Sequence, residues 1–310
     1  MESIYNVFAG LNVYVQILLF LIGCIMVSSV LKYARRPGFD VDNKHVLITG
    51  GSEGLGLAFA RVCLKLGANV TIVSRSKDKL ATAVQELSAD KKADRKLFSY
   101  SCDVTNFEDV QKMIAACNEE MNRTTDVVVV SAGMATPGLF LEQNMSVFHK
   151  LMDVNYFGAV HVAKACMPPM IANGVKGRIS FVSSAAALTP FVGFTQYCGS
   201  KSALRGFADA LRCEAGSQGI DVSVMFPSNI DTPGFVEEQK TKPEPTKTIE
   251  ALGGLVSPEE VAEYLLDGLK NGHYQITNEL FLELSRIQSN GLNPRNSLVT
   301  EMLWYPIVCK

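Results

Sequence analysis

Short apolar segments alternate with helical patterns along most of this chain, and this alternation limits the possible folds more than any other feature. Six segments are predicted strands because they are apolar at nearly every position rather than at every second one. These segments are His45–Thr49, Val70–Val73, Leu97–Cys102, Val127–Ser131, Arg178–Ser183 and Val222–Phe226. Strands of this kind belong to a parallel sheet that helices cover on both faces.

Amphipathic helical patterns occupy the intervals between these strands. The predicted helices are Leu55–Leu66, Lys77–Ser88, Phe107–Met121, Ser146–Ala172 and Gln196–Gln218. A last helix is predicted to begin at Ser257, with proline at its first position and Glu260 three residues on. Parallel strands need right-handed crossovers, so we predict an α/β fold with a Rossmann-type doubly wound parallel sheet, in a single domain over residues 44–310. A polar stretch at about 234–254 is predicted to be a mobile flap.

The segment Val13–Leu31 is 19 residues long and carries no charge, so as a helix it would reach about 28 Å and span a bilayer. The basic residues Lys32, Arg35 and Arg36 follow it, whereas Glu2 is the only charged residue before it. This asymmetry predicts an N-terminal membrane-anchor helix in residues 1–31, a linker at 32–43 and the rest of the chain in the cytosol. A buried hairpin or an interfacial helix is the alternative, because three polar residues dilute the segment.

Composition argues against several classes of function. The chain has 29 Lys and Arg against 31 Asp and Glu, and the resulting net charge of −2 predicts no nucleic-acid partner. Its eight cysteines lack paired spacing and include Cys63, Cys117 and Cys166 in apolar runs, so we expect reduced core residues. The four histidines share no metal-ligand spacing, and no metal is predicted. Asp126 and Asp153 are expected to be capping or surface carboxylates.

A glycine-rich turn follows the first predicted strand and leads directly into a helical pattern. It runs from Thr49 to Gly56 as TGGSEGLG. Glycines let backbone N–H groups and a helix N-terminus approach a pyrophosphate, whose charge the helix dipole favours. We therefore predict a dinucleotide site rather than a purely structural turn. Its predicted contacts are Gly50, Ser52, Glu53, Gly54 and Gly56.

The end of the second predicted strand indicates which dinucleotide binds. A site for NAD usually places an acidic residue there to bind the ribose 2′-hydroxyl, whereas this chain has Ser74 followed by Arg75. A guanidinium pairs with a 2′-phosphate, so NADPH/NADP is the predicted cofactor. Lys79 either adds a second positive contact or is a solvated surface lysine. Asp103, after the third strand, either accepts a hydrogen bond from the adenine amino group or caps the next helix.

The strongest indication of chemistry is a tyrosine and a lysine four residues apart, Tyr197 and Lys201. This spacing places both side chains on one face of a helix. A phenol loses its proton near pH 10, but a positive charge about 4 Å away is worth up to roughly 4 kcal/mol, or about three pKa units. We therefore expect Lys201 to lower the pKa of Tyr197 into the range useful for acid–base catalysis.

Together these residues resemble the short-chain dehydrogenase/reductase family over roughly residues 44–270. The glycine turn is similar to that family's T-G-x-x-x-G-x-G motif, and Tyr197 with Lys201 is similar to its Y-x-x-x-K motif. Ser184 lies 13 residues before Tyr197, where the family has its catalytic serine; the neighbouring Ser183 would point to the opposite side of the strand. Asn155 resembles the family's catalytic asparagine, which holds a water for proton relay through the lysine.

The resemblance also implies the remaining cofactor contacts. The backbone of Ile230 and the hydroxyl of Thr232 are expected to meet the nicotinamide carboxamide. The other implied contacts are Val104, Ala132 and Gly133. One departure is clear, because Ser131 precedes the Ala132-Gly133 pair where many members have an asparagine that stabilises the strand.

Within the family, the resemblance is strongest to members that reduce 3-ketosphinganine to sphinganine with NADPH at the cytosolic face of the endoplasmic reticulum. The stretches Phe191–Lys201 and Asp231–Pro243 carry this likeness. It implies that Tyr197 donates a proton to the C3 oxygen while Ser184 binds that oxygen. A steroid, retinoid or fatty acyl ketone is an alternative substrate, because these residues do not contact its far end. An inactive nucleotide-binding scaffold is the alternative from another class.

A long-chain ketone would remain in the bilayer, because each methylene gains about 0.8 kcal/mol on leaving water. The predicted partners are therefore a lipid ketone and a membrane, and the resemblance implies that this is the endoplasmic reticulum membrane. The oligomeric state stays open and is compatible with a homo-oligomer. The flap at about 234–254 and the apolar run Met302–Val308 are expected to line the entrance for the alkyl chain. Packing on the core is the alternative for Met302–Val308.

Overall fold

A single parallel sheet of seven strands forms the centre of the protein, in the order β3-β2-β1-β4-β5-β6-β7. The computed structural model describes residues 12–34, 39–251, 253–297, 300–301 and 304. The strands are β1 His45–Thr49, β2 Asn69–Ser74, β3 Leu97–Ser101, β4 Val127–Val130, β5 Arg178–Val182, β6 Asp221–Phe226 and β7 Gln275–Thr277. The predicted doubly wound parallel sheet is confirmed, and β7 is a strand that the sequence analysis missed.

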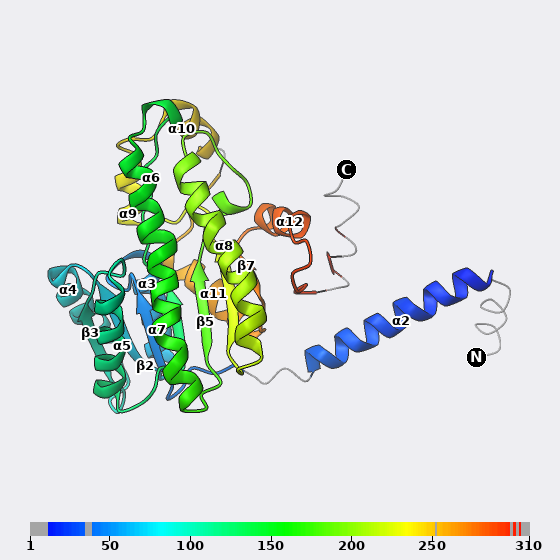
Figure 1. The fold of residues 1–310 in the computed structure, drawn as a ribbon, viewed down its shortest axis with the longest axis horizontal. Helices are drawn as coiled ribbons and strands as arrows, with labels where there is room; N and C mark the ends of the chain where they lie inside the picture. The colour runs from blue at the N-terminus through cyan, green and yellow to red at the C-terminus, as the bar shows by residue number, and fades with distance from the viewer. Residues whose placement is uncertain (1–11, 35–38, 252, 298–299, 302–303, 305–310) are drawn as a thin grey trace.

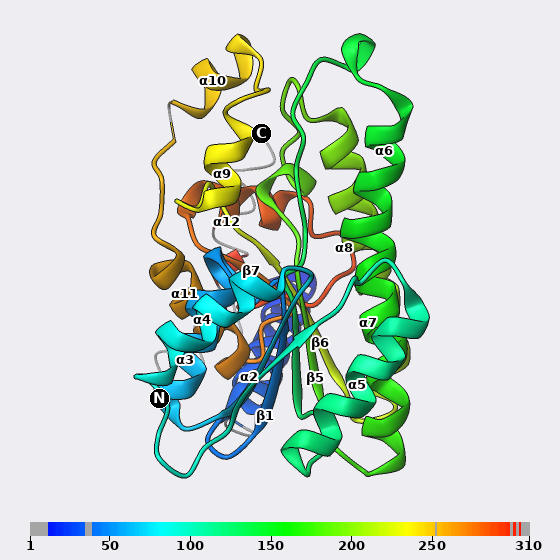
Figure 2. The ribbon, with the colours of Figure 1, turned by 90° about the vertical axis from the view of Figure 1, so that its left-hand side faces the viewer.

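Helices cover both faces of the sheet, as Figure 2 shows with the sheet between two helical layers. One layer contains α3 Gly54–Leu66, α4 Lys77–Ser88 and α11 Pro258–Lys270, and the other contains α5 Phe107–Met121, α7 Gly158–Ala172 and α8 Thr195–Gly216. Successive residues of β1 alternate between the two cores, with Val46 and Ile48 in one and Leu47 in the other. This alternation explains why the strand is apolar at every position.

The long helix predicted over Ser146–Ala172 is wrong in one respect. The chain forms α6 Met145–Met152, a π-helical turn η2 Asp153–Phe157 and then α7. A π turn inserts an extra residue into the helical repeat and is frequent at functional sites. Here it carries Asn155, which is almost completely buried.

The segment predicted as a mobile flap contains two short helices, α9 Pro233–Glu238 and α10 Glu244–Glu250. Thr232 caps α9 by accepting a hydrogen bond from the N–H of Phe235 at 3.1 Å. Thr246 is buried and donates a hydrogen bond to the carbonyl oxygen of Val192 at 2.7 Å. The segment therefore makes specific hydrogen bonds although its composition is polar. Its mobility stays a prediction.

The predicted start of α11 is confirmed, because the Ser257 hydroxyl accepts a hydrogen bond from the N–H of Glu260 at 3.2 Å. The N-terminal segment forms α2 Val13–Ala34, which Figure 1 shows standing apart from the sheet and its helices. Within the described part of the chain, no helix has both the length and the hydropathy required to cross a bilayer.

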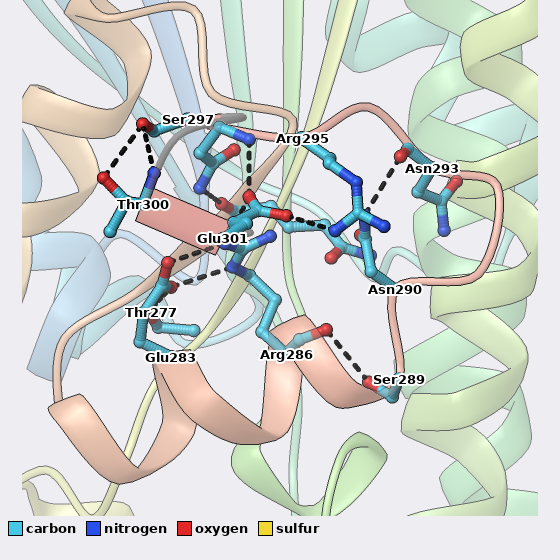
Figure 3. A network of polar contacts seen from close by, with 12 residues as sticks. Thr277, Glu283, Arg286, Ser289, Asn290, Asn293, Arg295, Ser297, Thr300 and Glu301 are labelled. Carbon is cyan, nitrogen blue, oxygen red and sulfur yellow. Dashed lines mark hydrogen bonds and ion pairs between the residues drawn. The ribbon is translucent and has the colours of Figure 1, made fainter. Parts of the chain in front are cut away.

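The C-terminal part of the chain is attached to the sheet through buried ion pairs. The chain also contains two short 3-10 helices, η1 Phe140–Glu142 and η3 Ala185–Ala187. Near the C-terminus lies helix α12 Leu280–Gln288. Arg286 on α12 donates hydrogen bonds to Glu283 at 2.6 Å and to Glu301 at 2.8 Å, as Figure 3 shows. Most of the predicted apolar run Met302–Val308 lies outside the described residues.

Buried side chains agree with most of the remaining sequence predictions. Cys63, Cys117 and Cys166 are buried and unpaired, and Asp153 is exposed. The expectation for Asp126 is wrong, because this carboxylate is only 7% exposed. It accepts hydrogen bonds from the backbone N–H of His45 at 2.9 Å and from Arg123 at 2.6 Å, and these bonds compensate its burial.

Candidate active site

A cavity of about 720 Å³ opens at the carboxyl ends of the strands. Ligands of doubly wound sheets bind at this edge, near the place where the strand order reverses, which here is between β1 and β4. The segments that follow six successive strands line the cavity. They contribute Gly50 and Ser52, Arg75, Asp103 and Val104, Ala132 and Gly133, Ser184, and Ile230 and Thr232. The fold thus brings all the predicted cofactor residues except Gly56 to one cavity.

The glycine turn after β1 is too crowded for side chains. Gly50 has a φ of +69°, and a Cβ atom there would lie 2.8 Å from the backbone nitrogen of Ala132. A Cβ atom on Gly56 would lie 2.2 Å from the carbonyl oxygen of Gly50. The turn therefore keeps its backbone N–H groups accessible at the start of α3, which is the cradle that a pyrophosphate needs.

The two basic residues after β2 have different surroundings. Arg75 is exposed at the cavity, and its guanidinium makes no ion pair with any described residue. Lys79 is paired instead with Glu53 at 2.7 Å, and both side chains are largely exposed. Arg75 is thus the group available to a 2′-phosphate, whereas Lys79 already has a partner.

Asp103 is not the cap of the following helix, so that alternative is wrong. The cap of α5 is Asn106, whose side chain accepts a hydrogen bond from the N–H of Asp109. Asp103 accepts hydrogen bonds from the backbone N–H and the hydroxyl of Thr105, at 3.0 and 2.9 Å. These bonds use one oxygen, Oδ1, and leave Oδ2 for an amino group at the cavity wall.

Thr49 performs the stabilisation that an asparagine performs in many family members. Its hydroxyl accepts a hydrogen bond from the N–H of Ala132 at 3.3 Å, and its carbonyl oxygen accepts one from the N–H of Ser131 at 3.1 Å. The loop after β4 is therefore held against β1 in spite of the missing asparagine.

The predicted catalytic residues Ser184, Tyr197 and Lys201 line the same cavity. Tyr197 stands in the first turn of α8, where its ring lies 5.7 Å from the ring of Phe194. The Nζ atom of Lys201 lies 5.8 Å from the centre of the tyrosine ring and donates a hydrogen bond to the carbonyl oxygen of Val182 at 2.9 Å. An ammonium has three donor hydrogens, so two are left to act toward the cavity.

The two candidate serines point in different directions, as strand alternation predicts. Ser183 is buried and donates a hydrogen bond to the backbone oxygen of Lys201 at 3.0 Å. Ser184 is partly exposed, accepts a hydrogen bond from the N–H of Ala186 at 3.2 Å and lines the cavity together with Tyr197. Only Ser184 is therefore placed to share a carbonyl oxygen with the phenol.

The expectation that Lys201 lowers the pKa of Tyr197 is wrong for this structure. Burial raises the pKa of Tyr197 above its ordinary value, and the negative charge of Glu238 raises it further, although the hydrogen bond with Ser184 acts in the opposite direction. Burial also lowers the pKa of Lys201 to about 8, against the effect of Glu238. Desolvation of the phenolate outweighs the nearby amine, so Tyr197 stays protonated at neutral pH. A protonated phenol is the form that can donate a proton.

Asn155 reaches the site from the π turn. Its amide nitrogen donates hydrogen bonds to the carbonyl oxygen of Met134 and to the hydroxyl of Ser200, and its oxygen accepts one from the N–H of Met134, all at 2.9 Å. A Cβ atom added to Gly133 would lie 3.2 Å from both Asn155 Oδ1 and Lys201 Nζ. Asn155 and Lys201 therefore face each other across this glycine.

The sequence analysis missed the residues on the substrate side of the cavity. Glu238 on α9 lines the cavity together with Phe191, Phe194 and Phe235. Burial raises the pKa of Glu238 to about 7, although the positive charge of Lys242 lowers it. The sequence offered no local signal for this pair, because α9 ends at Glu238 and Lys242 lies outside any helix.

Comparison with known proteins places the chain in a class. Residues 44–243 match the family model for short chain dehydrogenases, and the chain belongs to this family. Its fold is shared by a short-chain dehydrogenase/reductase from Burkholderia phymatum in complex with NAD, with a TM-score of 0.72 and 22% identity over 84% of this chain and 99% of that one. An actinorhodin polyketide ketoreductase variant with NADPH has a TM-score of 0.68 and 25% identity over 77% of this chain and 95% of that one.

Among curated proteins, the similarity extends to a particular group of reductases. The 3-ketodihydrosphingosine reductase of Dictyostelium discoideum is 37% identical over 306 residues, which cover 94% of this chain and 91% of that protein. The 3-ketodihydrosphingosine reductase of Mus musculus is 38% identical over 232 residues, which cover 74% of this chain and 69% of that protein. The resemblance seen in the sequence is thus confirmed at the level of the family and of these relatives.

Proposed function

We propose that this protein reduces 3-ketosphinganine, also called 3-ketodihydrosphingosine, to sphinganine in sphingolipid synthesis. The observation that carries the proposal is the similarity, along nearly the whole chain, to proteins named for this activity. The cavity supports it, because Ser184, Tyr197 and Lys201 meet there at the carboxyl edge of the sheet. A scaffold without turnover would not need to keep all three groups, and this observation favours an enzyme.

NADPH is the proposed cofactor. The crowded glycine turn fits a pyrophosphate, and the exposed guanidinium of Arg75 fits a 2′-phosphate at the position where a carboxylate would select NAD. Gly50, Ser52 and Gly54 would hold the phosphates, and Ile230 and Thr232 the nicotinamide end. When bound, the cofactor supplies the hydride.

We expect an Arg75→Ala variant to bind NADPH about 10- to 100-fold more weakly, because a charge-assisted hydrogen bond to phosphate is lost. Its KM for NADH should change little, since NADH has no 2′-phosphate. Steady-state kinetics with both dinucleotides measure the difference. A Lys79→Ala variant is the matched control and should have the smaller effect, because Lys79 is already paired with Glu53. An equal loss for NADPH and NADH in Arg75→Ala would contradict this role.

The chain's own residues have separable roles in the proposed reaction. Tyr197 donates its proton to the oxygen at C3, and Ser184 donates a hydrogen bond to that same oxygen. Lys201 holds the nicotinamide ribose and keeps positive charge beside the phenol. Asn155 faces Lys201 across Gly133, which supports a shared path for returning a proton to Tyr197. Asn155 also fixes the loop after β4 through its two hydrogen bonds with Met134.

An alkyl chain fits the apolar side of the cavity. Phe191, Phe194 and Phe235 line it, and exposed apolar residues continue beyond it. The N–H of Gly138 donates a hydrogen bond to the carbonyl oxygen of Gly193, so the exposed segment at 139–141 adjoins the loop that carries Phe191 and Phe194. An apolar rim of this kind supports a lipid ketone as substrate.

We propose that the protein is bound to the endoplasmic reticulum membrane with its catalytic domain in the cytosol. The positive charges after Val13–Leu31 support this orientation. Apolar side chains on α2 are exposed, among them Tyr14 at 78% and Phe20 at 68%, and exposed apolar area of this kind favours contact with a membrane.

The full chain is expected to float with phosphatidylcholine vesicles at high salt, because apolar contact with a membrane is not screened. A Leu19→Asp variant should float less, since a charge near a helix centre costs about 2.5–3.5 kcal/mol on insertion. Density-gradient flotation measures the bound fraction. Leu292→Asp is the control, because Leu292 is exposed far along the chain from α2. Equal flotation of wild type and Leu19→Asp would contradict membrane insertion by α2.

A direct comparison of substrates tests the proposed activity. The purified protein in detergent micelles is offered 3-ketosphinganine, a steroid ketone and retinal side by side, each with NADPH and with NADH. The proposal predicts oxidation of NADPH with 3-ketosphinganine and appearance of sphinganine by mass spectrometry. Turnover of only the steroid ketone or retinal would assign the alternative substrates, and no turnover of any ketone would favour the scaffold.

A further inference from the structure

The cavity contains a group of charges that the proposed reaction does not use. We call Glu238, Lys242 and Glu250 the acidic cluster. The side chain of Lys242 is completely buried, forms an ion pair with Glu250 and lies 3.8 Å from Glu238. Two carboxylates therefore share one ammonium, and Glu238 and Glu250 both line the cavity.

The surroundings of the acidic cluster are apolar. The Nζ atom of Lys242 lies 4.4 Å from the centre of the Phe235 ring and 5.7 Å from that of Phe194. An excess negative charge is costly in such an environment unless a second cation is near. The only charged groups of the described chain that act on Glu238 are Lys242, Glu250 and Lys201. Burial and Glu250 raise the pKa of Glu238 to about 7, against the effects of the two lysines.

The acidic cluster lies close to the reacting groups. The charge of Glu238 affects both Tyr197 and Lys201, and all three side chains line the same cavity. Phe194 bridges the two regions, because its ring lies 5.7 Å from that of Tyr197 and 5.7 Å from the amine of Lys242. Because Tyr197 and Glu238 line the same cavity, a substrate whose carbonyl oxygen meets Tyr197 has Glu238 in the wall of its binding site.

3-Ketosphinganine carries an amine on C2, directly beside the C3 carbonyl. We propose that Glu238, held by Lys242 and supported by Glu250, binds the ammonium group of the substrate and so selects 2-amino ketones over ketones without an amine. Within the acidic cluster, binding would pair two carboxylates with two ammonium groups, and Lys201 is a further cation that acts on Glu238. This inference rests on the proposed function and assigns the feature that distinguishes the proposed substrate from other long-chain ketones.

The test compares two ketones that differ only in the amine, 3-ketosphinganine and 1-hydroxyoctadecan-3-one, with NADPH and the full chain. A Glu238→Gln variant is expected to lose about 10- to 100-fold in kcat/KM for the amino ketone, mainly through KM, because a hydrogen bond between charged groups is lost. Its kcat/KM for the other ketone should change less than about threefold. Glu237→Gln is the matched control, since Glu237 is exposed and paired with Lys240. Glu238→Asp keeps the charge and should restore most of the preference.

The pH profile gives a second readout. For the wild type, kcat/KM with the amino ketone should rise as Glu238 ionises near pH 7 and fall again when the substrate amine loses its proton. Glu238→Gln should lack the rise. Equal losses for both ketones would overturn the inference, because Glu238 would then act only on Lys201 or on folding. If the wild type reduces neither ketone, the proposed function fails as well, and this outcome differs from an equal loss.

Discussion

A Tyr197→Phe variant is expected to reduce a ketone about 10²- to 10⁴-fold more slowly than the wild type, which is the usual contribution of a positioned general acid. A phenol is protonated at neutral pH and can donate its proton when negative charge develops on the carbonyl oxygen. Burial and Glu238 raise the pKa of Tyr197 further, so the proton moves only as that oxygen becomes the stronger base. Phenylalanine keeps the ring but has no proton to give. Single-turnover measurement of NADPH oxidation follows this step.

The same variant should keep its fold and its dinucleotide site. The ring of Phe194 packs at 5.7 Å from the ring of Tyr197, and this contact needs no hydroxyl. The melting temperature and the Kd for NADPH are therefore expected to stay close to those of the wild type, so a lower rate can be attributed to the missing proton. Unchanged NADPH consumption on a ketone substrate would reject Tyr197 as the proton donor.

Six of the seven strands could be predicted because each of them has a local signal. In β1 and β4 every residue is buried, so hydrophobicity alone marks them. β7 has only three residues, and its Gln275 is buried without a hydrogen-bond partner for its side chain. Such a short strand depends on pairing with β6, which is more than 40 residues earlier in the sequence, and no local pattern reports that contact.

The residues expected to contact the cofactor and the catalytic residues could also be predicted, since the motifs fix their spacing. The pKa of the catalytic tyrosine could not be predicted. The pair Tyr197 and Lys201 suggested a lowered phenol pKa, but desolvation and Glu238 depend on how α9 folds over the cavity. The burial of Lys242 could not be predicted either, because lysine is rarely buried and the polar segment around it gives no sign that its amine is enclosed.

The buried polar contacts of Arg286 and Glu301, here called the C-terminal network, could not be predicted either. Arginine and glutamate usually lie at the surface. Here Arg286 is completely buried and Glu301 is 1% exposed, so each requires the other. Figure 3 shows Glu301 between Arg286 and Arg295. The N–H of Asn296 also donates a hydrogen bond to Glu301, at 2.8 Å. The side-chain nitrogen of Asn296 donates in turn to the carbonyl oxygen of Gln275 in β7 at 2.8 Å. This network therefore connects the end of the chain to the edge of the sheet.

A Glu301→Ala variant is expected to lower the free energy of unfolding by about 3 kcal/mol, because it leaves the buried guanidinium of Arg286 with Glu283 as its remaining ion-pair partner. For a domain of this size the melting temperature should fall by about 6–12 °C. Thermal and urea unfolding measure both quantities. The matched control is Glu263→Gln on α11, whose side chain is exposed and should give a change below about 0.5 kcal/mol.

A further variant separates the charge from the packing. Replacing Arg286 and Glu301 together by methionine removes both buried charges, and a pair replaced by apolar groups of similar volume often costs little. The double variant should therefore be more stable than Glu301→Ala, although Arg295 and the N–H of Asn296 also lose an acceptor. If Glu301→Ala unfolds like the wild type, the C-terminal segment does not stabilise the sheet edge. If the double variant is the less stable of the two, packing by Arg286 rather than its unpaired charge explains the loss.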